Sequence, residues 1–503
     1  MSTVTPRRAS AVPVARDGFP QLLRAEWTKL RTVRRWGITL LAAVLVTVLV
    51  SLFSAVSSGS EVSNGGRGKP PTGPEGQSIV DNFPFVHRTL TGDGSVTARV
   101  GAPAGQGDSA TPPWAKAGLL IKESTRPGSE YAALMLTARH GVRLQSGFSR
   151  DVAGSAVPPG TSRWLRLTRS GATVTGYESA DGSHWREVGT VELAGPPRAL
   201  PVGMFVASPD IQSAERSFGS MSLDQNPSRS AARFDRVALD GRAGAADWRL
   251  TDVGEPHVRM GDLDRSKGTF TLAGSGDIAP APPQNDLAVM ALDGAQLGLV
   301  LIAALGVLFI TSEYRRDMIR TTFTASPRRG RVLAAKAVVI GAAAFVAGLV
   351  ACVAAFLVSA PELKGGDPLP MLFADLSLTD GPALRAVIGT AAVLALVAVL
   401  ALGLGALMRG TAAAIATVVV LFVLPLILLG GLPLGLAHGI QRLTPVAGFA
   451  VQNTLPRYDQ VATVCLPEES CYPQGPWTGV ATLALYAVLV LGAAMWRLRR
   501  RDA

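Results

Sequence analysis

Six windows of about 20 apolar residues constrain what this chain can fold into more than any other feature. They lie at 37–56, 289–312, 332–359, 384–407, 411–430 and 477–496. A helix of about 20 apolar residues spans the hydrocarbon core of a bilayer, so each window predicts a transmembrane helix. Asp293 lies near the start of the second window, and Pro425 interrupts the fifth. We therefore expect a polytopic α-helical membrane protein with six transmembrane helices.

The net charge of +11 is confined to a few segments, namely 1–36, 313–336, Arg409 and 497–501. Residues 57–288 carry 24 basic and 24 acidic residues and are neutral. An excess of Lys and Arg near helix ends marks the cytoplasmic side, and six crossings place all four basic segments on one side. Both termini and the tail 497–503 are then cytoplasmic, and 57–288 is extracellular. The basic charge indicates membrane orientation, not nucleic-acid binding.

The extracellular segment has the pattern of an all-β domain. Residues 1–18 are polar and predicted to be disordered, and 57–77 is a Gly-, Ser- and Pro-rich linker. Within 78–288, short alternating runs are separated by turn residues; they lie at 95–100, 117–122, 131–136, 164–168, 173–177, 185–191 and 202–206. Such spacing is typical of an antiparallel β-sandwich. Asp181 and Gly182 provide a tight turn between two of the runs.

Residues 92–100, 114–122, 164–169 and 179–185 resemble the concanavalin-like jelly-roll domains attached to bacterial surface proteins. In such domains a stretch like 248–278 commonly precedes this pattern, whereas here it follows. Either 244–279 closes a permuted sandwich, or a partial second copy begins there. Trp114, Trp164 and Trp185 either stack on a sugar or peptide ligand or pack in the core.

Two basic segments border the apolar windows on the cytoplasmic side. In 19–36, Leu22, Leu23, Trp27, Leu30 and Val33 recur at helical spacing among Arg and Lys, which predicts an amphipathic helix in the headgroup plane that contacts lipid. In 313–331, apolar and basic side chains alternate before Pro327, which ends a helix. Alternatively, 313–331 is a loop whose arginines only bind anionic lipid headgroups.

Both segments resemble bacterial ABC-2 type transporter permeases. Glu26, Trp27, Lys29 and Leu30 look like part of the elbow helix. Glu313 looks like the start of a cytoplasmic coupling helix, where an acid complements the helix dipole. The resemblance implies that the coupling helix contacts an ABC ATPase subunit through Glu313, Tyr314, Arg315, Arg316, Met318, Ile319, Arg320 and Phe323. It also implies a second permease, identical or not, and a bacterial plasma-membrane location.

Other sites follow from single features. No G-x-x-x-x-G-K-[ST] phosphate loop occurs, so we expect no cofactor in this chain, with ATP and Mg bound by the partner subunit. The five scattered histidines predict no metal site. Cys465 and Cys471 lie in the extracellular loop 431–476, where an oxidising exterior permits a disulfide. That loop is also expected to hold a re-entrant element. Lys336 and Arg385 lie near span ends, where such side chains can snorkel. No chain of buried charges is expected that would suggest a proton relay, which argues against a secondary transporter.

The resemblance to ABC-2 permeases, with the absence of a phosphate loop, implies a transport subunit that is not itself an enzyme. It would be the permease of an ATP-binding cassette exporter that moves a hydrophobic or amphipathic substrate. The alternative is a membrane-anchored surface protein that binds cell-wall glycan or peptide through its β-sandwich.

Overall fold

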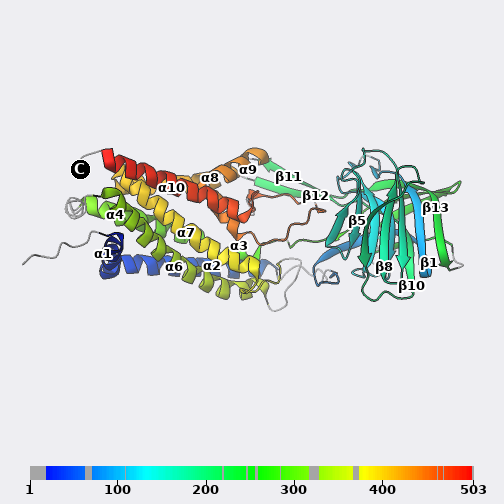
Figure 1. Ribbon diagram of the computed structural model, residues 1–503, viewed down its shortest axis with the longest axis horizontal. Helices are drawn as coiled ribbons and strands as arrows, with labels where there is room; N and C mark the ends of the chain where they lie inside the picture. The colour runs from blue at the N-terminus through cyan, green and yellow to red at the C-terminus, as the bar shows by residue number, and fades with distance from the viewer. Residues whose placement is uncertain are drawn as a thin grey trace, which may run out of the picture.

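The computed structural model describes residues 18–62, 71–107, 109–217, 220–244, 247–254, 259–283, 285–315, 328–365, 373–461, 463–467 and 470–500. It has two parts arranged along the long axis, a bundle of helices and a β-domain (Figure 1). The first basic helix α1 (Phe19–Thr32) and the C-terminal end of the last helix lie at the end of the bundle that faces away from the β-domain.

Six long apolar helices form the bundle, and each is long and apolar enough to cross a membrane. They are α2 (Arg34–Val62), α4 (Ala295–Arg315), α6 (Arg329–Lys364), α7 (Gly381–Met408), α8 (Thr411–Leu429) and α10 (Pro476–Arg500). This confirms the six helices expected from hydropathy. The central helix is α7, where small residues allow close approach. A Cβ atom on Gly405 would lie 2.7 Å from Ile310 on α4, and one on Gly389 would lie 2.1 Å from Val451.

The prediction of one continuous helix over 289–312 is wrong at its start, because the helix is interrupted there. A short helix α3 (Leu287–Ala291) is capped by Asp286, and a turn separates it from α4. Gly294 in this turn packs directly on α2, where a Cβ would lie 2.0 Å from the carbonyl oxygen of Thr47. Its N–H donates to Ser51 Oγ at 3.0 Å. Hydropathy does not detect a break made by close packing of two helices.

The expected extracellular loop 431–476 contains two further helical elements. Helix α9 (Leu434–Leu443) is followed by a 3₁₀ helix η1 (Pro445–Gln452), whose eight residues are all buried. Element η1 packs against α7 and α10. Helix α8 continues through Pro425 to Leu429. The segment expected to re-enter is therefore a folded part of the bundle.

A large antiparallel sheet of 15 strands forms the β-domain. Its main strands are β1 (Ile79–Val100), β3 (Lys116–Lys122), β4 (Tyr131–Thr137), β5 (Val142–Ser146), β6 (Arg150–Ala153), β7 (Arg163–Ser170), β8 (Thr173–Ser179), β9 (Arg186–Glu192), β10 (Ala199–Ala207) and β13 (Ser230–Ala243). A separate hairpin joins β11 (Ile211–Ser217) to β12 (Ser220–Asn226), and β2 (Ala104–Gly105) pairs with β13. Six of the seven runs expected to be strands lie within β1, β3, β4, β7, β8 and β10, and the seventh, 185–191, lies within β9 except for Trp185, which precedes it.

Strand β1 is long enough to pair with two groups of strands, one that includes β10 and one that includes β7, which form the two halves of the sheet. Residues 85–91 pair with β10, residues 94–100 pair with β7, and the register against β13 shifts between Thr91 and Gly94. The two halves enclose one core, to which Leu119 and Leu134 contribute from one half and Leu165 and Leu167 from the other. A second buried cluster lies on the opposite face of β1, β3, β4 and β10, and it includes the aromatic residues Phe83, Phe85, Tyr131, Phe148 and Phe205.

Residues 244–279 belong to the same sheet. Strand β14 (Arg249–Val253) and strand β17 (Asp277–Pro280) pair with β1. Strand β16 (Thr269–Gly274) pairs with β13 and with β15 (Gly261–Ser266). This pairing matches a sandwich closed by 244–279 and leaves no separate partial copy within the described residues.

Candidate functional site

The end of the bundle opposite the β-domain is strongly basic. Its described cations lie on α1, on the starts of α2 and α6, at the C-cap of α7 and on the last turn of α10. They include Arg24, Arg31, Arg34, Arg35, Arg328, Arg331, Arg409, Arg497, Arg499 and Arg500. The described acids at this end are Glu26 and Glu313, and both are buried. The basic end therefore has the charge expected of a cytoplasmic face.

Helix α1 is amphipathic, as the spacing of its leucines predicted. Leu30 is buried against Trp36 and the bundle, with Leu23 beside it, while Trp27 is 51% exposed. Val33 interrupts the helix in an extended conformation, which separates α1 from α2. Burial of Leu30 and exposure of Trp27 give α1 one face on the bundle and one face directed outward.

Four charged side chains, two from α1 and one each from α4 and α6, meet where α1 packs on the bundle. Lys336 Nζ on α6 lies 2.7 Å from Glu26 Oε2 on α1 and 2.6 Å from Glu313 Oε1 on α4. Lys29 Nζ on α1 lies 2.9 Å from Glu26 Oε1 and 3.2 Å from Glu313 Oε1. The Lys336 side chain is 1% exposed and Lys29 is 42% exposed. We call Glu26, Lys29, Glu313 and Lys336 the charge cluster.

The charge cluster holds two acids and two bases, so it is neutral as a unit. Burial alone would lower the pKa of Lys29, but hydrogen bonds and charges from Glu26 and Glu313 outweigh that effect and raise it. Removing one member of a buried ion pair costs about 3–5 kcal/mol, because the remaining charge stays in a poorly hydrated place. The cluster therefore fixes the positions of α1, α4 and α6 relative to one another.

Three expectations about the cluster were wrong. Lys336 does not snorkel, because Glu26 and Glu313 meet it inside the bundle. A chain of buried charges therefore exists, although none was expected. Glu313 does not begin a helix either; it lies near the C-terminus of α4, which ends at Arg315. An acid there opposes the helix dipole, and Lys29 and Lys336 offset this unfavourable position.

The segment expected to contact an ATPase follows directly on Glu313. Tyr314 is half-buried, with the Arg409 guanidinium 5.6 Å from its ring centre. The backbone of Arg315 ends α4. Arg316, Met318, Ile319, Arg320 and Phe323 lie outside the described residues, so their coupling role stays a prediction. The charge cluster occupies both flanks of this segment, with Glu313 before it and Lys336 after it.

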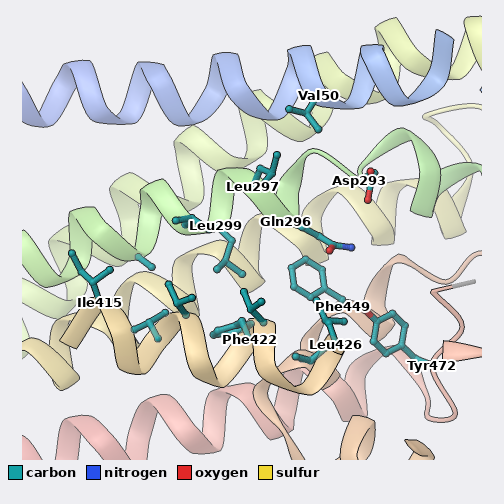
Figure 2. Close-up of a pocket in the computed structure, with 16 residues that line it drawn as sticks. Val50, Asp293, Gln296, Leu297, Leu299, Ile415, Phe422, Leu426, Phe449 and Tyr472 are labelled. Carbon is teal, nitrogen blue, oxygen red and sulfur yellow. The ribbon is translucent and has the colours of Figure 1, made fainter. Parts of the chain in front are cut away.

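An apolar cavity of about 250 Å³ lies between α2, α4, α8 and η1. Its wall is formed mainly by aliphatic side chains and Phe422, whereas Asp293, Gln296 and Tyr472 bring polar groups. Figure 2 shows these three near one end of the cavity and Ile415 at the other. Leu297 is 52% exposed and Leu426 is 41% exposed, so the cavity opens on the side of the bundle. One signal of this site is visible in the sequence, namely the acid within the second apolar window.

The segment between η1 and α10 attaches the β-domain to the bundle. Asp286 Oδ1 accepts a hydrogen bond from Thr454 Oγ1 at 2.6 Å, and Oδ2 accepts one from the N–H of Leu455 at 3.1 Å. Gln460 Nε2 donates to the carbonyl oxygens of Phe148 and Ser149 at 3.2 and 3.3 Å. We call residues 453–472 the strap.

The strap is closed by the predicted disulfide. Cys465 and Cys471 are bonded, with their Cα atoms 5.3 Å apart. Cys352 is a free, buried thiol on α6, as expected of a small apolar residue. Arg385 donates to the carbonyl oxygen of Asn453, so it binds the strap instead of extending past the span end.

The three candidate stacking tryptophans do not form one surface. Trp114 is 5% exposed and stacks on His140 at 3.9 Å, with the Arg143 guanidinium 5.4 Å from its ring. Trp164 packs against the turn at Gly182, where a Cβ would lie 2.7 Å from its ring. Trp185 is half-buried, with the Arg166 guanidinium 4.0 Å away. Each tryptophan thus has its own partner within the domain.

Within the described ranges, no group of three or more His, Cys, Asp or Glu side chains is arranged to hold a metal ion. Two buried ion pairs of the β-domain, Lys122–Asp81 at 2.8 Å and Lys116–Asp277 at 2.7 Å, instead pair acid with base.

No family model and no curated protein matches the chain. Among solved structures, scytalido-glutamic peptidase is similar to it at 12% identity and a TM-score of 0.27, over 38% of this chain and 98% of that one. SCP-B, a member of the Eqolisin family of peptidases, is similar at 11% identity and a TM-score of 0.26, with the same coverage. The GH43 protein BlXynB from Bacillus licheniformis is similar at 15% identity and a TM-score of 0.18, over 23% of this chain and 24% of that one. At these TM-scores the likeness carries no conclusion about activity.

Proposed function

We propose that this chain is the permease subunit of an ATP-driven exporter of the ABC-2 type, located in a bacterial plasma membrane. The observation that carries the proposal is the charge cluster. It joins the amphipathic helix α1 to the two helices that flank segment 316–327. A segment that receives force from a motor must be anchored on both flanks to the body that it moves.

The distribution of charge supports the orientation in this proposal. The basic end would face the cytoplasm and an ATPase subunit, and the β-domain would lie outside as a jelly-roll sandwich. ATP and Mg would be bound by that subunit, because no phosphate loop occurs in this sequence. A second permease, identical or not, would complete the translocation path.

The cavity supports export of an amphipathic or hydrophobic substrate. It lies between spans, is lined mainly by aliphatic side chains and opens sideways. A molecule dissolved in the bilayer can enter such a cavity without crossing water. Small-molecule sites in helical bundles lie between helices and are mostly apolar with a few polar groups, as here.

Affinity purification tests the proposal. The tagged full chain is extracted from its native membrane in mild detergent, and proteins that accompany it are identified by mass spectrometry. We expect a protein with a phosphate-loop motif, together with ATPase activity in the eluate. The double variant Arg316→Ala/Arg320→Ala should lose that protein, while Glu187→Ala on the exposed edge of β9 should retain it. Absence of any nucleotide-binding protein from the wild-type eluate would refute the proposal.

A further inference from the structure

We propose that the cavity binds amphiphiles that carry one positive charge, a primary amine or a quaternary ammonium group on an aliphatic tail. This inference deepens the proposed function by naming a substrate class. It rests on that function only for the direction of transport, because binding of the ligand needs no ATPase.

The first argument is the charge of the polar end. Among the residues that line the cavity, Asp293 is the one with a charged side chain. The Ser54 side chain on α2 hydrogen-bonds to its carboxylate. No Lys or Arg of the described residues forms an ion pair with Asp293 within 4.0 Å, in contrast to Glu26, Glu313 and Asp81. A half-buried carboxylate without a cationic partner at the edge of an apolar cavity favours a cationic ligand.

The second argument is the aromatic surface beside Asp293. Phe449 on η1 and Tyr472 on the strap both line the cavity and are nearly buried, at 4% and 3% exposure. Figure 2 shows both rings near Gln296 and Asp293. Aromatic faces attract ammonium groups through the ring quadrupole, most strongly where water is excluded. A carboxylate and two aromatic rings at one end form a suitable place for an ammonium head.

The third argument is the shape and lining of the remainder. From Gln296 to Ala303 the cavity follows α4 for about 10 Å, at a rise of 1.5 Å per residue. Its opposite wall is formed by α8, with Ile415, Val419 and Phe422. At about 250 Å³ it is just below the usual range of ligand pockets, roughly 300–1,000 Å³. An aliphatic tail with a small head fits this space, whereas a large ring system does not.

Anionic and neutral amphiphiles should bind less well for the same reasons. An anionic head would meet Asp293, and no described cation lines the cavity to receive it. A neutral hydroxyl would accept a hydrogen bond from the Gln296 amide or donate one to the Asp293 carboxylate, but it would gain no charge attraction. The three matched probes are therefore octyltrimethylammonium, octanol and octanoate, each of which has a straight chain of eight carbon atoms.

The test measures saturable binding of these probes to the purified full chain in nanodiscs of phosphatidylcholine, with empty nanodiscs subtracted. Three variants are compared with the wild type. Asp293→Asn removes the charge at nearly constant shape, and Val419→Trp fills the cavity from its half-exposed wall. Asp459→Asn makes the same chemical change on an exposed strap residue that does not line the cavity.

We expect the wild type to bind octyltrimethylammonium more tightly than octanol or octanoate. Asp293→Asn should weaken binding of the cation about tenfold or more, as expected for loss of a partner to a charged group, and leave octanol unchanged. Val419→Trp should weaken binding of octyltrimethylammonium and of octanol, whereas Asp459→Asn should change the binding of neither. Equal affinity for the three probes, no effect of Asp293→Asn, or no effect of Val419→Trp would each overturn the inference. Co-purification of an ATPase is measured separately, so failure of one proposal is distinguishable from failure of the other.

Discussion

Replacement of Lys336 by methionine tests the charge cluster directly. Methionine keeps most of the volume of the side chain and removes its charge. Glu26 Oε2 then loses its 2.7 Å partner, and Glu313 Oε1 keeps only Lys29 at 3.2 Å. Because the two carboxylates stay buried, we expect a loss of about 3–5 kcal/mol in stability.

The free thiol of Cys352 provides the assay. It is 0% exposed, and Cys465 and Cys471 are oxidised, so a maleimide reagent should label the chain only when the bundle opens. When opening and closing are fast relative to labelling, the labelling rate follows the population of the open form. A loss of 3–5 kcal/mol raises that population roughly a hundred- to several-thousand-fold.

Two comparisons separate the cluster from a general effect of the substitution. Lys364 lies at the other end of the same helix and pairs with Asp375, whose side chain is 88% exposed, so Lys364→Met should cost less than about 1 kcal/mol. The double variant Glu313→Gln/Lys336→Met leaves the neutral pair Glu26–Lys29 and should be more stable than Lys336→Met alone. If Lys336→Met and Lys364→Met labelled at the same rate, the cluster would not stabilise the bundle.

Three further predictions follow from the fold. Alkylation of the unfolded chain should block Cys465 and Cys471 only after reduction, as shown by peptide mass spectrometry. In intact cells a membrane-impermeant maleimide should label Glu187→Cys in the β-domain but not Arg331→Cys at the basic end, and the reverse pattern would refute the proposed orientation. Asp286→Ala should lower the free energy of unfolding by about 2 kcal/mol, because it removes the N-cap of α3 and the hydrogen-bond acceptor for the strap. Amide hydrogen exchange at 287–289 and 453–455 should become faster, and unchanged exchange would contradict this prediction.

The parts of the fold that could be predicted are those encoded locally. Twenty apolar residues in succession require a long buried or membrane-spanning helix, and alternation with turn residues requires strands. The disulfide could also be predicted from the sequence, because Cys465 and Cys471 are separated by only 6 positions. Each of these signals lies within one short stretch of chain.

The charge cluster could not be predicted in the same way, because its members are distant in the sequence. Glu313 and Lys29 are separated by 284 positions, and Lys336 and Glu26 by 310. Read locally, Lys336 is a cation near the start of an apolar window, where snorkelling is the ordinary outcome. Only the packing of α1 against α4 and α6 brings two acids to it. The same holds for the cavity, whose walls come from four separate elements.

Helix α4 connects the two sites that the sequence did not predict. Its 21 residues extend over about 30 Å, with Glu313 near its last turn and Gln296 at its first. Because the charge cluster fixes the Glu313 end to α1 and α6, a displacement of segment 316–327 has to move α4 as a rigid body or separate buried charges. A shift of α4 changes the distance between Leu299 and the α8 wall, and therefore the cavity. If both proposals hold, binding of a cationic amphiphile and binding of the ATPase must alter each other's affinity by the same factor.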